Sequence, residues 1–505
     1  MRVRCCQILG LCISVLFLFT DLDAQSTLSF SPLNHYLAFL PTDLPASQSI
    51  NPAWLKTQLK EQVIYQVNAF SESGDFKRPF DPGRGLVSIY RASGTRQFGH
   101  NHLFTGTFAY HQRALAEKQW VHNSIPYNGN PFLFADSTVG GFNLRGLFWE
   151  VGYANVLRHH WTTGLAVFYN VDEEYKTVFP RSQVKHRDLQ VRLGTGWQNG
   201  LRTYYGFCLS YFDFQENMNT TPYSLEQGKT PIFIKIRATD NPLLARGQTS
   251  EERLLAIQGV NLTLDGNQEL RRGNFNFLAG AEQAQAQNVD GGAYPVAQGR
   301  WYVNRYYFQT EIKRYLWRNN AIGLFSNGSL EEQWAKHPEI NQKIYALRTR
   351  ALTGGVKIQL NLGQHCQTQP QIYFTSTTYK KADFYNGTLL YYPVNWAGYS
   401  QNFTLRNAHG SLIELTGGFQ LSRSGNAQIY FERQDWYYQQ ITAREIDYYL
   451  QDQSIAWGEL HCRLKGRGNS FFHGSLQYRL TQPATGGSPI FHKREQFVFN
   501  FSIER

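Results

Sequence analysis

The last nine residues of the chain alternate strictly between two kinds of side chain. Bulky apolar residues stand at every second position, which are Phe497, Phe499, Phe501 and Ile503. The positions between them carry Val498, Asn500, Ser502 and Glu504. Successive side chains of a β-strand point to opposite faces, so this segment predicts a strand with one apolar and one wetter face. Such a strand suits a membrane barrel, in which lipid covers the outer face and the lumen lies inside.

The N-terminus predicts export. Arg2 and Arg4 form a basic region, residues 8–19 form an apolar stretch, and a cleavage point follows Ala24. We therefore predict a signal peptide over residues 1–24. The apolar stretch is too short for a retained membrane anchor, because a spanning helix needs about 20 apolar residues. Export and the terminal strand together predict a β-barrel in the outer membrane of a Gram-negative cell.

Composition agrees with this interpretation. Aromatic residues make up 15 % of the chain, with 30 Tyr and 35 Phe, which fits the aromatic girdles of membrane barrels. The net charge of +11 is spread along the chain, so no nucleic-acid partner is expected. Three cysteines remain after the leader, and an odd, widely spaced set predicts no disulfide framework; they are Cys208, Cys366 and Cys462.

The same alternation recurs along the chain. The clearest segments are residues 274–283, 356–362, 413–421, 459–464 and 472–480. Further candidate strands lie at residues 86–91, 102–111, 142–153, 161–171, 189–197, 204–214, 302–316, 371–378, 403–408 and 428–436. At about 9 to 11 residues per crossing, we predict an all-β fold: a transmembrane antiparallel β-barrel of about 14 strands, within roughly 12 to 16, over residues 85–505.

Turn and loop chemistry orients the predicted barrel. Glycine and asparagine at residues 423–426 and 465–470 favour tight hairpins, which suit periplasmic turns. Longer polar stretches at residues 216–272 and 286–299 are expected to form extracellular loops. The Ala- and Gln-rich segment of residues 279–287 is interpreted as a strand end and loop.

Residues 25–84 differ in kind, because six prolines interrupt them. A short helix is expected over residues 52–66, with Asn51 as its cap and Pro52 at its first position. This mostly irregular segment could fold into the lumen as a plug. The alternative is that it lies in the periplasm.

Several stretches resemble known barrels. Residues 49–54, with Asn51, Pro52 and Ala53, resemble the Asn-Pro-Ala motif of Bacteroidota barrels similar to long-chain fatty-acid transporters. Residues 108–110, 130–140, 173–176 and 181–196 resemble a Bacteroidota outer-membrane β-barrel family of unknown function. The resemblance runs from about residue 84 to the C-terminus. It implies a fold and a location, and it brings no catalytic motif.

No catalytic, cofactor or metal residue is predicted. The chain lacks a Gly-x-Ser-x-Gly elbow, a phosphate loop, a His-Glu-x-x-His motif and a Cys-x-x-Cys motif. Adjacent residues of an extended chain point apart, so His159 and His160 are more simply a turn than a metal site. The same holds for His365 with Cys366, since no second ligand pair is near.

Two further groups of residues have a structural explanation that needs no catalysis or metal binding. His473 and Ser475 share one strand face, as in a barrel lipase, but a polar lumen explains them without catalysis. The acidic run at residues 172–174 follows a strand and could hold a cation at the outer rim, although a solvated loop is the usual interpretation.

Two functional classes follow. The first is a channel or transporter for a small or amphipathic solute, gated by residues 25–84. The second is a non-conducting scaffold or receptor whose loops bind a surface lipoprotein or glycan. The expected partners are outer-membrane lipids and lipopolysaccharide, an outer-membrane insertase during assembly, and a surface lipoprotein. An enzyme is not expected.

Overall fold

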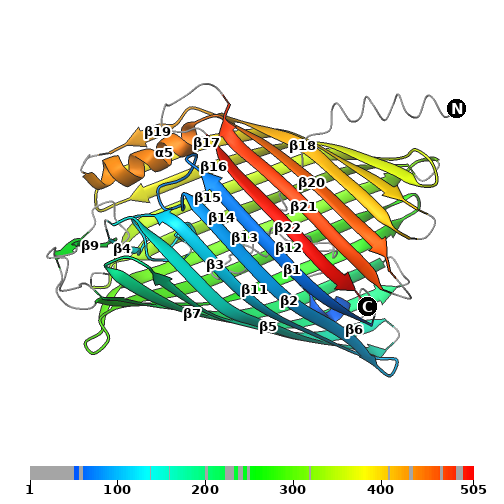
Figure 1. Cartoon of the computed structure of the whole chain (residues 1–505), viewed down its shortest axis with the longest axis horizontal. Helices are drawn as coiled ribbons and strands as arrows, with labels where there is room; N and C mark the ends of the chain where they lie inside the picture. The colour runs from blue at the N-terminus through cyan, green and yellow to red at the C-terminus, as the bar shows by residue number, and fades with distance from the viewer. Residues whose placement is uncertain are drawn as a thin grey trace.

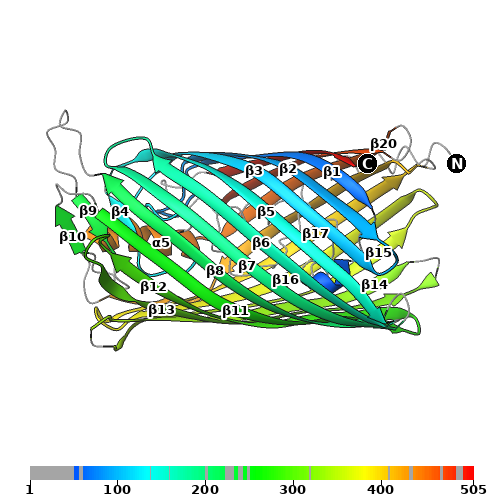
Figure 2. The ribbon, with the colours of Figure 1, turned by 90° about the horizontal axis from the view of Figure 1, so that it is seen from below.

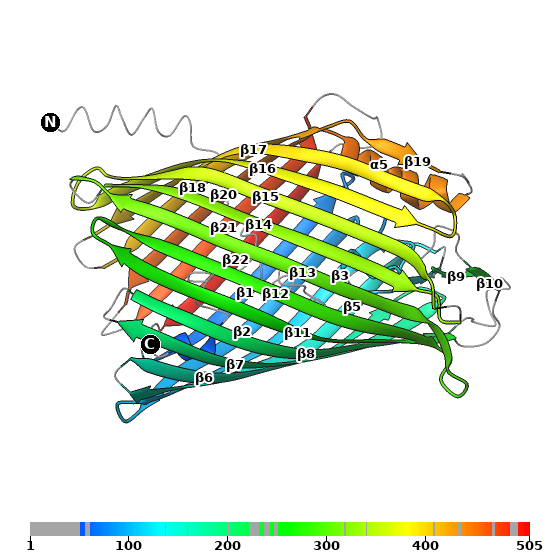
Figure 3. The same ribbon diagram turned by 180° about the vertical axis from the view of Figure 1, so that it is seen from behind.

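The computed structural model describes residues 51–55, 61–124, 126–136, 138–158, 160–199, 203–221, 232–236, 243–246, 251–317, 320–339, 341–407, 410–431, 436–466, 470–484 and 493–504. The predicted signal peptide and residues 25–50 lie outside them. Figures 1, 2 and 3 show one long barrel with strongly tilted strands.

The chain forms a closed antiparallel β-barrel of 18 strands, and one extra strand, β19 (Gln428–Tyr430), pairs with β17 alone. Its first half comprises β1 (Gln62–Gly74), β2 (Arg84–Phe98), β3 (His102–Lys118), β5 (Gly140–Arg158), β6 (Trp161–Lys176), β7 (Arg181–Asn199), β8 (Thr203–Thr221), β11 (Glu251–Leu270) and β12 (Gly273–Asp290). Its second half comprises β13 (Val296–Tyr315), β14 (Ala321–Lys336), β15 (Lys343–Asn361), β16 (Cys366–Asp383), β17 (Thr388–Arg406), β18 (Leu412–Ser424), β20 (Gln453–Lys465), β21 (Phe471–Pro483) and β22 (Arg494–Glu504).

The barrel closes between its first and last strands. β1 pairs antiparallel with β22, and Phe70 lies opposite Val498. No strand edge is left along this seam, as lipid requires. The even number and the all-β fold were predicted, but the predicted count of about 14 is wrong. Three barrel strands, β1, β11 and β14, were absent from the predicted set.

The terminal strand has the predicted faces. Phe497, Phe499 and Phe501 point outward, with exposed fractions of 47, 48 and 39 %, whereas Val498 and Asn500 are buried on the inner face. The same outward apolar rows cover other strands of the barrel, for example Val260, Leu262 and Leu264 of β11. A continuous apolar outer surface results.

The apolar rows stop before the strands do. On β7 the outward residues change from Leu189, Val191 and Leu193 to the polar Gln183, Lys185 and Arg187. Opposite this polar stretch, the inward positions are buried and mixed, with Val184 between Ser182 and His186. Strands of 19 and 20 residues exceed the roughly 9 to 11 that cross a bilayer. One end of the barrel therefore extends beyond the apolar band.

The two ends of the barrel differ. Short links join the strands at the end where β1 begins and β22 ends, which we call the terminus end. The opposite end, called the loop end, carries the small sheet of β4 (Phe134–Asp136), β9 (Ile232–Lys235) and β10 (Leu243–Arg246), together with α5 (Ala443–Leu450). In Figures 1 and 2 these elements gather opposite the C-terminus.

Several predicted turns and loops are corrected. Residues 465–470 do link β20 and β21 at the terminus end, but residues 423–426 end β18 at the loop end and lead toward β19 and α5. The predicted loops 216–272 and 286–299 are largely strand: β8, β11, β12 and β13 run through them. The Ala- and Gln-rich segment lies inside β12. Polar outward side chains, which belong to the part beyond the apolar band, gave these strands the composition of loops.

The predicted boundary at residue 84 is also wrong. Residues 62–74 form β1 rather than irregular chain, and residues 84–98 form β2. Of the helix expected over residues 52–66, residues 52–54 form a 3-10 turn and residues 62–66 belong to β1, while residues 56–60 lie outside the described residues. Its cap is as predicted, because the Asn51 side chain accepts a hydrogen bond from the Ala53 N–H and Pro52 opens the turn.

Candidate functional site

Segments from four links fold together at the loop end, and we call them the cap. The cap consists of the described residues within 75–83, 119–138, 232–236 and 436–450. Its apolar centre is formed by Phe80, Val121, Leu133, Ala135, Ile234, Ile236, Tyr437 and Ile441. Residues far apart in the sequence therefore share one small core across the loop end.

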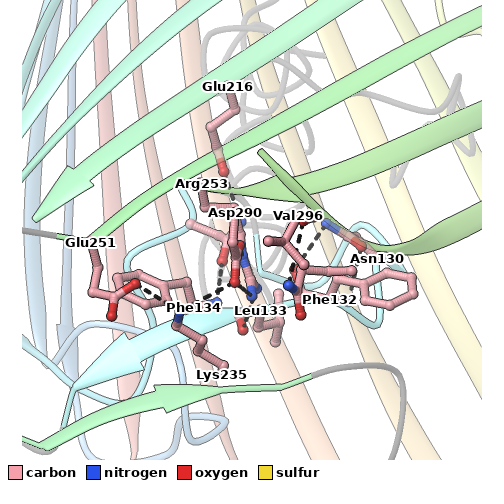
Figure 4. Close-up of polar contacts among 12 residues, drawn as sticks. Asn130, Phe132, Leu133, Phe134, Glu216, Lys235, Glu251, Arg253, Asp290 and Val296 are labelled. Atoms are coloured by element: carbon pink, nitrogen blue, oxygen red, sulfur yellow. Dashed lines mark hydrogen bonds and ion pairs between the residues drawn. The ribbon is translucent and has the colours of Figure 1, made fainter. Parts of the chain in front are cut away.

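The cap enters the lumen. Phe132 is fully buried among inward side chains of β8 and β11–β15, including Phe214, Ile257 and Trp301. Asn130 shapes the tip of this segment, since its Oδ1 accepts a hydrogen bond from the Phe132 N–H at 3.0 Å. Figure 4 shows this tip beside the wall of the barrel.

Buried ion pairs attach the cap to the wall. Asp136 Oδ2 of the cap lies 2.6 Å from Lys176 Nζ at the end of β6. His122 Nε2 lies 2.8 Å from the same carboxylate, and its Nδ1 lies 2.6 Å from the hydroxyl of Ser182 on β7. Burial lowers the pKa of His122, although Asp136 opposes this shift. The neutral imidazole therefore donates from Nε2 to Asp136 and accepts at Nδ1 from Ser182.

Asp136 remains ionised in this setting. Burial alone raises the pKa of its carboxyl, but the contacts with His122 and Lys176 outweigh burial and hold the pKa below its ordinary value of 3.8. Lys176 also contacts the carbonyl oxygen of Thr138 at 3.2 Å. The lysine thus ties two cap residues to β6.

A second polar cluster lies next to the first. Asn123 Nδ2 donates to Glu216 Oε1 at 2.7 Å, and the Ser124 hydroxyl donates to Glu174 Oε2 at 2.9 Å. Glu174 also pairs with Arg113 and, at 3.3 Å, with Lys118. Each cap group here has a partner on the inner face of β3, β6 or β8.

Ser124 superficially resembles a nucleophile. Its Oγ lies 2.7 Å from His186 Nε2, and His186 Nδ1 lies 3.3 Å from Glu216 Oε2. A hydroxyl has one proton, and Ser124 gives it to Glu174 instead of to the imidazole. The serine is also buried, so these contacts fasten the cap instead of presenting a reactive oxygen.

Arg253 of β11 makes a third attachment. Its Nε lies 2.6 Å from Asp290 Oδ1, and its Nη1 donates to the Leu133 carbonyl at 2.9 Å. Lys235 of β9 contacts Glu251 at 2.7 Å and Asp290 at 3.3 Å. Figure 4 shows Arg253 between Asp290 and the backbone of the cap.

A cavity of ≈ 180 Å³ lies between the cap and the inner wall. The wall side is formed by β14, β15 and β16, and the cap side by the 126–133 segment and α5. Six aromatic residues contribute to the lining, namely Phe80, Tyr127, Tyr345, Tyr379, Tyr437 and Tyr449. The polar lining includes Glu331, Gln333, Lys381 and Glu445.

The tyrosines are held as a group. The Tyr379 ring centroid is 4.6 Å from that of Tyr392, which in turn is 5.3 Å from Tyr449 of α5. Arg78 sits 3.6 Å above the Tyr127 ring and pairs with Asp81 at 3.0 Å. Burial raises the pKa of Tyr449 to about 12, despite the nearby Arg78. The phenols of Tyr449 and Tyr127, whose pKa burial also raises, thus stay protonated in neutral solution.

The N-terminal turn occupies a separate seat on the wall. Trp54 Nε1 donates to Asp265 Oδ2 of β11 at 2.5 Å, and Asn51 Nδ2 donates to Asp265 Oδ1 at 3.2 Å. Four glycines of the wall lie against this segment, namely Gly164, Gly194, Gly196 and Gly206. A Cβ added at any of them would come within 2.5 Å of residues 51–54. Register places Gly164 opposite Gly194, and Gly196 opposite Gly206. The wall is therefore hollowed where the turn packs.

The predicted weak constellations are dispersed. His160 contacts the Gln198 carbonyl at 2.7 Å at the terminus end, and His159 lies outside the described residues. His365 is exposed in the link before β16. His473 and Ser475 do share the inner face: His473 Nε2 lies 2.9 Å from Glu504, and Ser475 accepts from Asn500 at 2.8 Å.

The acidic run is corrected. Residues 172–174 lie within β6 rather than in a loop after it. Asp172 faces inward and contacts His111 at 2.7 Å, whereas Glu173 accepts from Gln183 at 2.5 Å. Within the described ranges, no group of three or more His, Cys, Asp or Glu is placed to hold a metal ion. No helix in that part of the chain is long and apolar enough to cross a membrane.

A family model matches residues 52–504 and is described as a family of unknown function (DUF6850). The chain belongs to this family. The match includes the N-terminal turn, the cap and every barrel strand. The predicted resemblance to a barrel family of unknown function is thereby confirmed, whereas the Bacteroidota origin and the likeness to fatty-acid transporters stay predictions. The sequence matches no curated protein.

Solved structures give only a distant likeness. The outer membrane transporter YddB from Escherichia coli is 7 % identical, with 87 % of this chain and 81 % of that chain covered and a TM-score of 0.39. The ferric yersiniabactin uptake receptor FyuA from Yersinia pestis is 11 % identical, with 89 and 81 % covered and a TM-score of 0.39. The alcaligin receptor FauA from Bordetella pertussis is 6 % identical, with 87 and 76 % covered and a TM-score of 0.41.

Proposed function

We propose that this chain is an outer-membrane barrel that passes a small polar or amphipathic solute, with the cap as its gate. The apolar outer band supports a place in the membrane, because lipid-facing rows of this kind would be costly in water. The polar part of the barrel beyond the band would then face outward from the cell, and the terminus end would face the periplasm. The signal peptide of residues 1–24 would direct export.

The attachment of the cap by buried charges carries this proposal. Asp136 with Lys176, and Asn123 with Glu216, are contacts that water can replace when the segment leaves the wall. Burying such pairs costs desolvation free energy, and water in an open lumen returns it. A plug held by apolar packing alone would expose its apolar surface to water on opening and would lose the free energy of burying it. The cap thus combines a modest apolar centre with many reversible polar contacts.

Single-channel conductance in planar bilayers tests the gate. Residues 121–136 are replaced by a flexible Gly-Ser linker, and the control replaces residues 291–295, an exposed link with no place in the cap. We expect the cap replacement to raise conductance strongly and the control to behave like the wild type. If neither form conducts while both remain heat-modifiable barrels, the gate proposal falls.

The second candidate is a non-conducting receptor, and the cavity at the loop end favours it. Such a barrel would bind a glycan or a surface lipoprotein there without passing it. In either case the outer band would contact lipids and lipopolysaccharide, and an outer-membrane insertase would assemble the barrel. We propose no enzymatic role.

A further inference from the structure

The cavity between the cap and the wall suits one class of ligand by its size. A volume of ≈ 180 Å³ is well below the roughly 300 to 1,000 Å³ of sites for drug-sized molecules. It is close to the roughly 150 Å³ cavity that accepts a single benzene ring. One six-membered ring therefore fills it.

Tyrosine rings line the cavity from both the wall and the cap. Tyr379 on β16 and Tyr449 on α5 lie 6.2 Å apart with an interplanar angle of 21°. Tyr345 and Tyr437 add further aromatic surface from the wall and the cap. Flat rings of this kind pack against the C–H face of a sugar ring while phenol hydroxyls reach its edge.

The polar lining mixes acceptors with donors. Glu445 supplies carboxylate oxygens and Lys381 supplies N–H groups. Glu331 also lines the cavity, where it accepts a hydrogen bond from Gln333 Nε2 and pairs with Arg305 at 3.7 Å. Trp301 Nε1 donates to Gln333 Oε1 at 3.2 Å, which fixes the amide beside the cavity. Glu331 and Glu445 are matched by Arg305 and Lys381, so the surroundings carry no net charge that would favour an anion or a cation. Hydroxyl groups, which donate and accept at the same atom, match this mixture best.

An organic cation is the competing occupant, because aromatic rings with carboxylates also attract cations. The protein already supplies positive charge here. Arg78 lies over the outer face of Tyr127, and Lys381 lines the same cavity. A further cation would meet these charges, whereas an uncharged ring would not.

We propose that this cavity binds one uncharged, pyranose-sized polyol, in other words a monosaccharide ring, between β14–β16 and the cap. This inference rests on the proposed function, since it names the solute that the barrel would admit. The cap then serves two roles: it closes the lumen and it completes the sugar site with Tyr449 and Glu445 of α5. Ligand release and cap movement become one event.

Calorimetric titration of the purified full chain in detergent tests the assignment. The probes are glucose, galactose and mannose, with glucuronate, choline and laurate as charged or chain-like comparisons. We expect saturable binding of at least one hexose. We also expect Tyr379→Ala on the wall and Glu445→Ala on the cap each to weaken it at least tenfold, and Tyr385→Ala, which is 70 % exposed outside the cavity, to leave it unchanged.

Each other outcome overturns the sugar assignment. These outcomes are no binding of any hexose, tighter binding of choline or laurate, or binding that both cavity variants leave intact in heat-modifiable barrels. The conductance of the cap replacement is measured separately. Conductance without sugar binding removes this assignment alone, whereas sugar binding without conductance removes the gate and supports the receptor.

Discussion

Gly164→Ala should release the N-terminal turn from its seat. A Cβ at Gly164 would lie 2.3 Å from the backbone carbon of Pro52, whereas ordinary contacts begin at 3.4 Å. No rotamer can relieve a clash with backbone, so the turn must move by about 1 Å. That shift stretches the 2.5 Å contact between Trp54 and Asp265 beyond hydrogen-bond range.

The expected effect is large and local. Hydrogen bonds to a charged group contribute at least about 1.5 kcal/mol each, and both Trp54 and Asn51 donate to Asp265. Losing both lowers the free energy of opening the turn by about 3 kcal/mol, which corresponds to about a 100-fold larger open population. Trp54→Phe keeps the ring but loses one donor, so about a tenfold change is expected.

Hydrogen exchange of the peptide that contains Ala53 and Trp54 measures this population, because exchange of their amides requires opening. In the closed turn the Ala53 N–H donates to Asn51 Oδ1 at 3.0 Å and the Trp54 N–H to the Asn51 carbonyl at 3.1 Å. Gly106→Ala is the matched control, since a Cβ there meets no atom within 4 Å. Equal exchange in Gly164→Ala and Gly106→Ala would refute the reasoning.

Three further predictions concern assembly and the gate. Replacing Phe499 and Phe501 with Asp should block membrane assembly, because both face outward in the apolar band, and loss of the heat-modifiable form measures it. Conductance should rise as pH falls below 6.5, the ordinary pKa of histidine. Burial lowers the pKa of His122 in the attached cap, so below pH 6.5 protonation favours the detached cap, in which water surrounds the imidazole. His122→Gln removes the titrating group and should flatten this response. Arg253→Met should raise conductance at neutral pH, since it removes the hydrogen bond that Arg253 donates to the Leu133 carbonyl of the cap, a charged-donor bond that contributes about 1.5 to 3 kcal/mol to cap attachment; unchanged conductance would contradict the role of Arg253 in Figure 4.

Alternation revealed 15 of the 18 barrel strands and missed β1, β11 and β14. Residues 321–336 of β14 contain glycine, serine and three consecutive polar residues, a composition that predicts a turn. In β11, Glu251 and Glu252 begin a strand whose first part lies beyond the band. There both faces mix polar and apolar residues, as inward Arg253 and outward Leu254 show, so the expected alternation is lost. A rule that assigns every polar stretch of sequence to a loop fails for such strands.

The candidate site depends on contacts that local sequence does not report. Asp136 and Lys176 are 40 residues apart, and Asn123 and Glu216 are 93 apart. Only the register of the barrel brings them together. Residues 130–140 stand out in the sequence only for their resemblance to the family. Their position between two strands indicates that they could fold inward. The pairing of its charges with β6 and β8 could not be predicted without the closed sheet.

The seat of the N-terminal turn has a consequence for biogenesis. Its floor is made by β6, β7 and β8, and its anchoring carboxylate, Asp265, belongs to β11. Residues near the start of the chain can therefore dock only after the sheet has formed as far as β11, the eighth of its 18 strands. Docking becomes a checkpoint that reports completion of that part, and a chain truncated before β11 should leave Trp54 open to exchange.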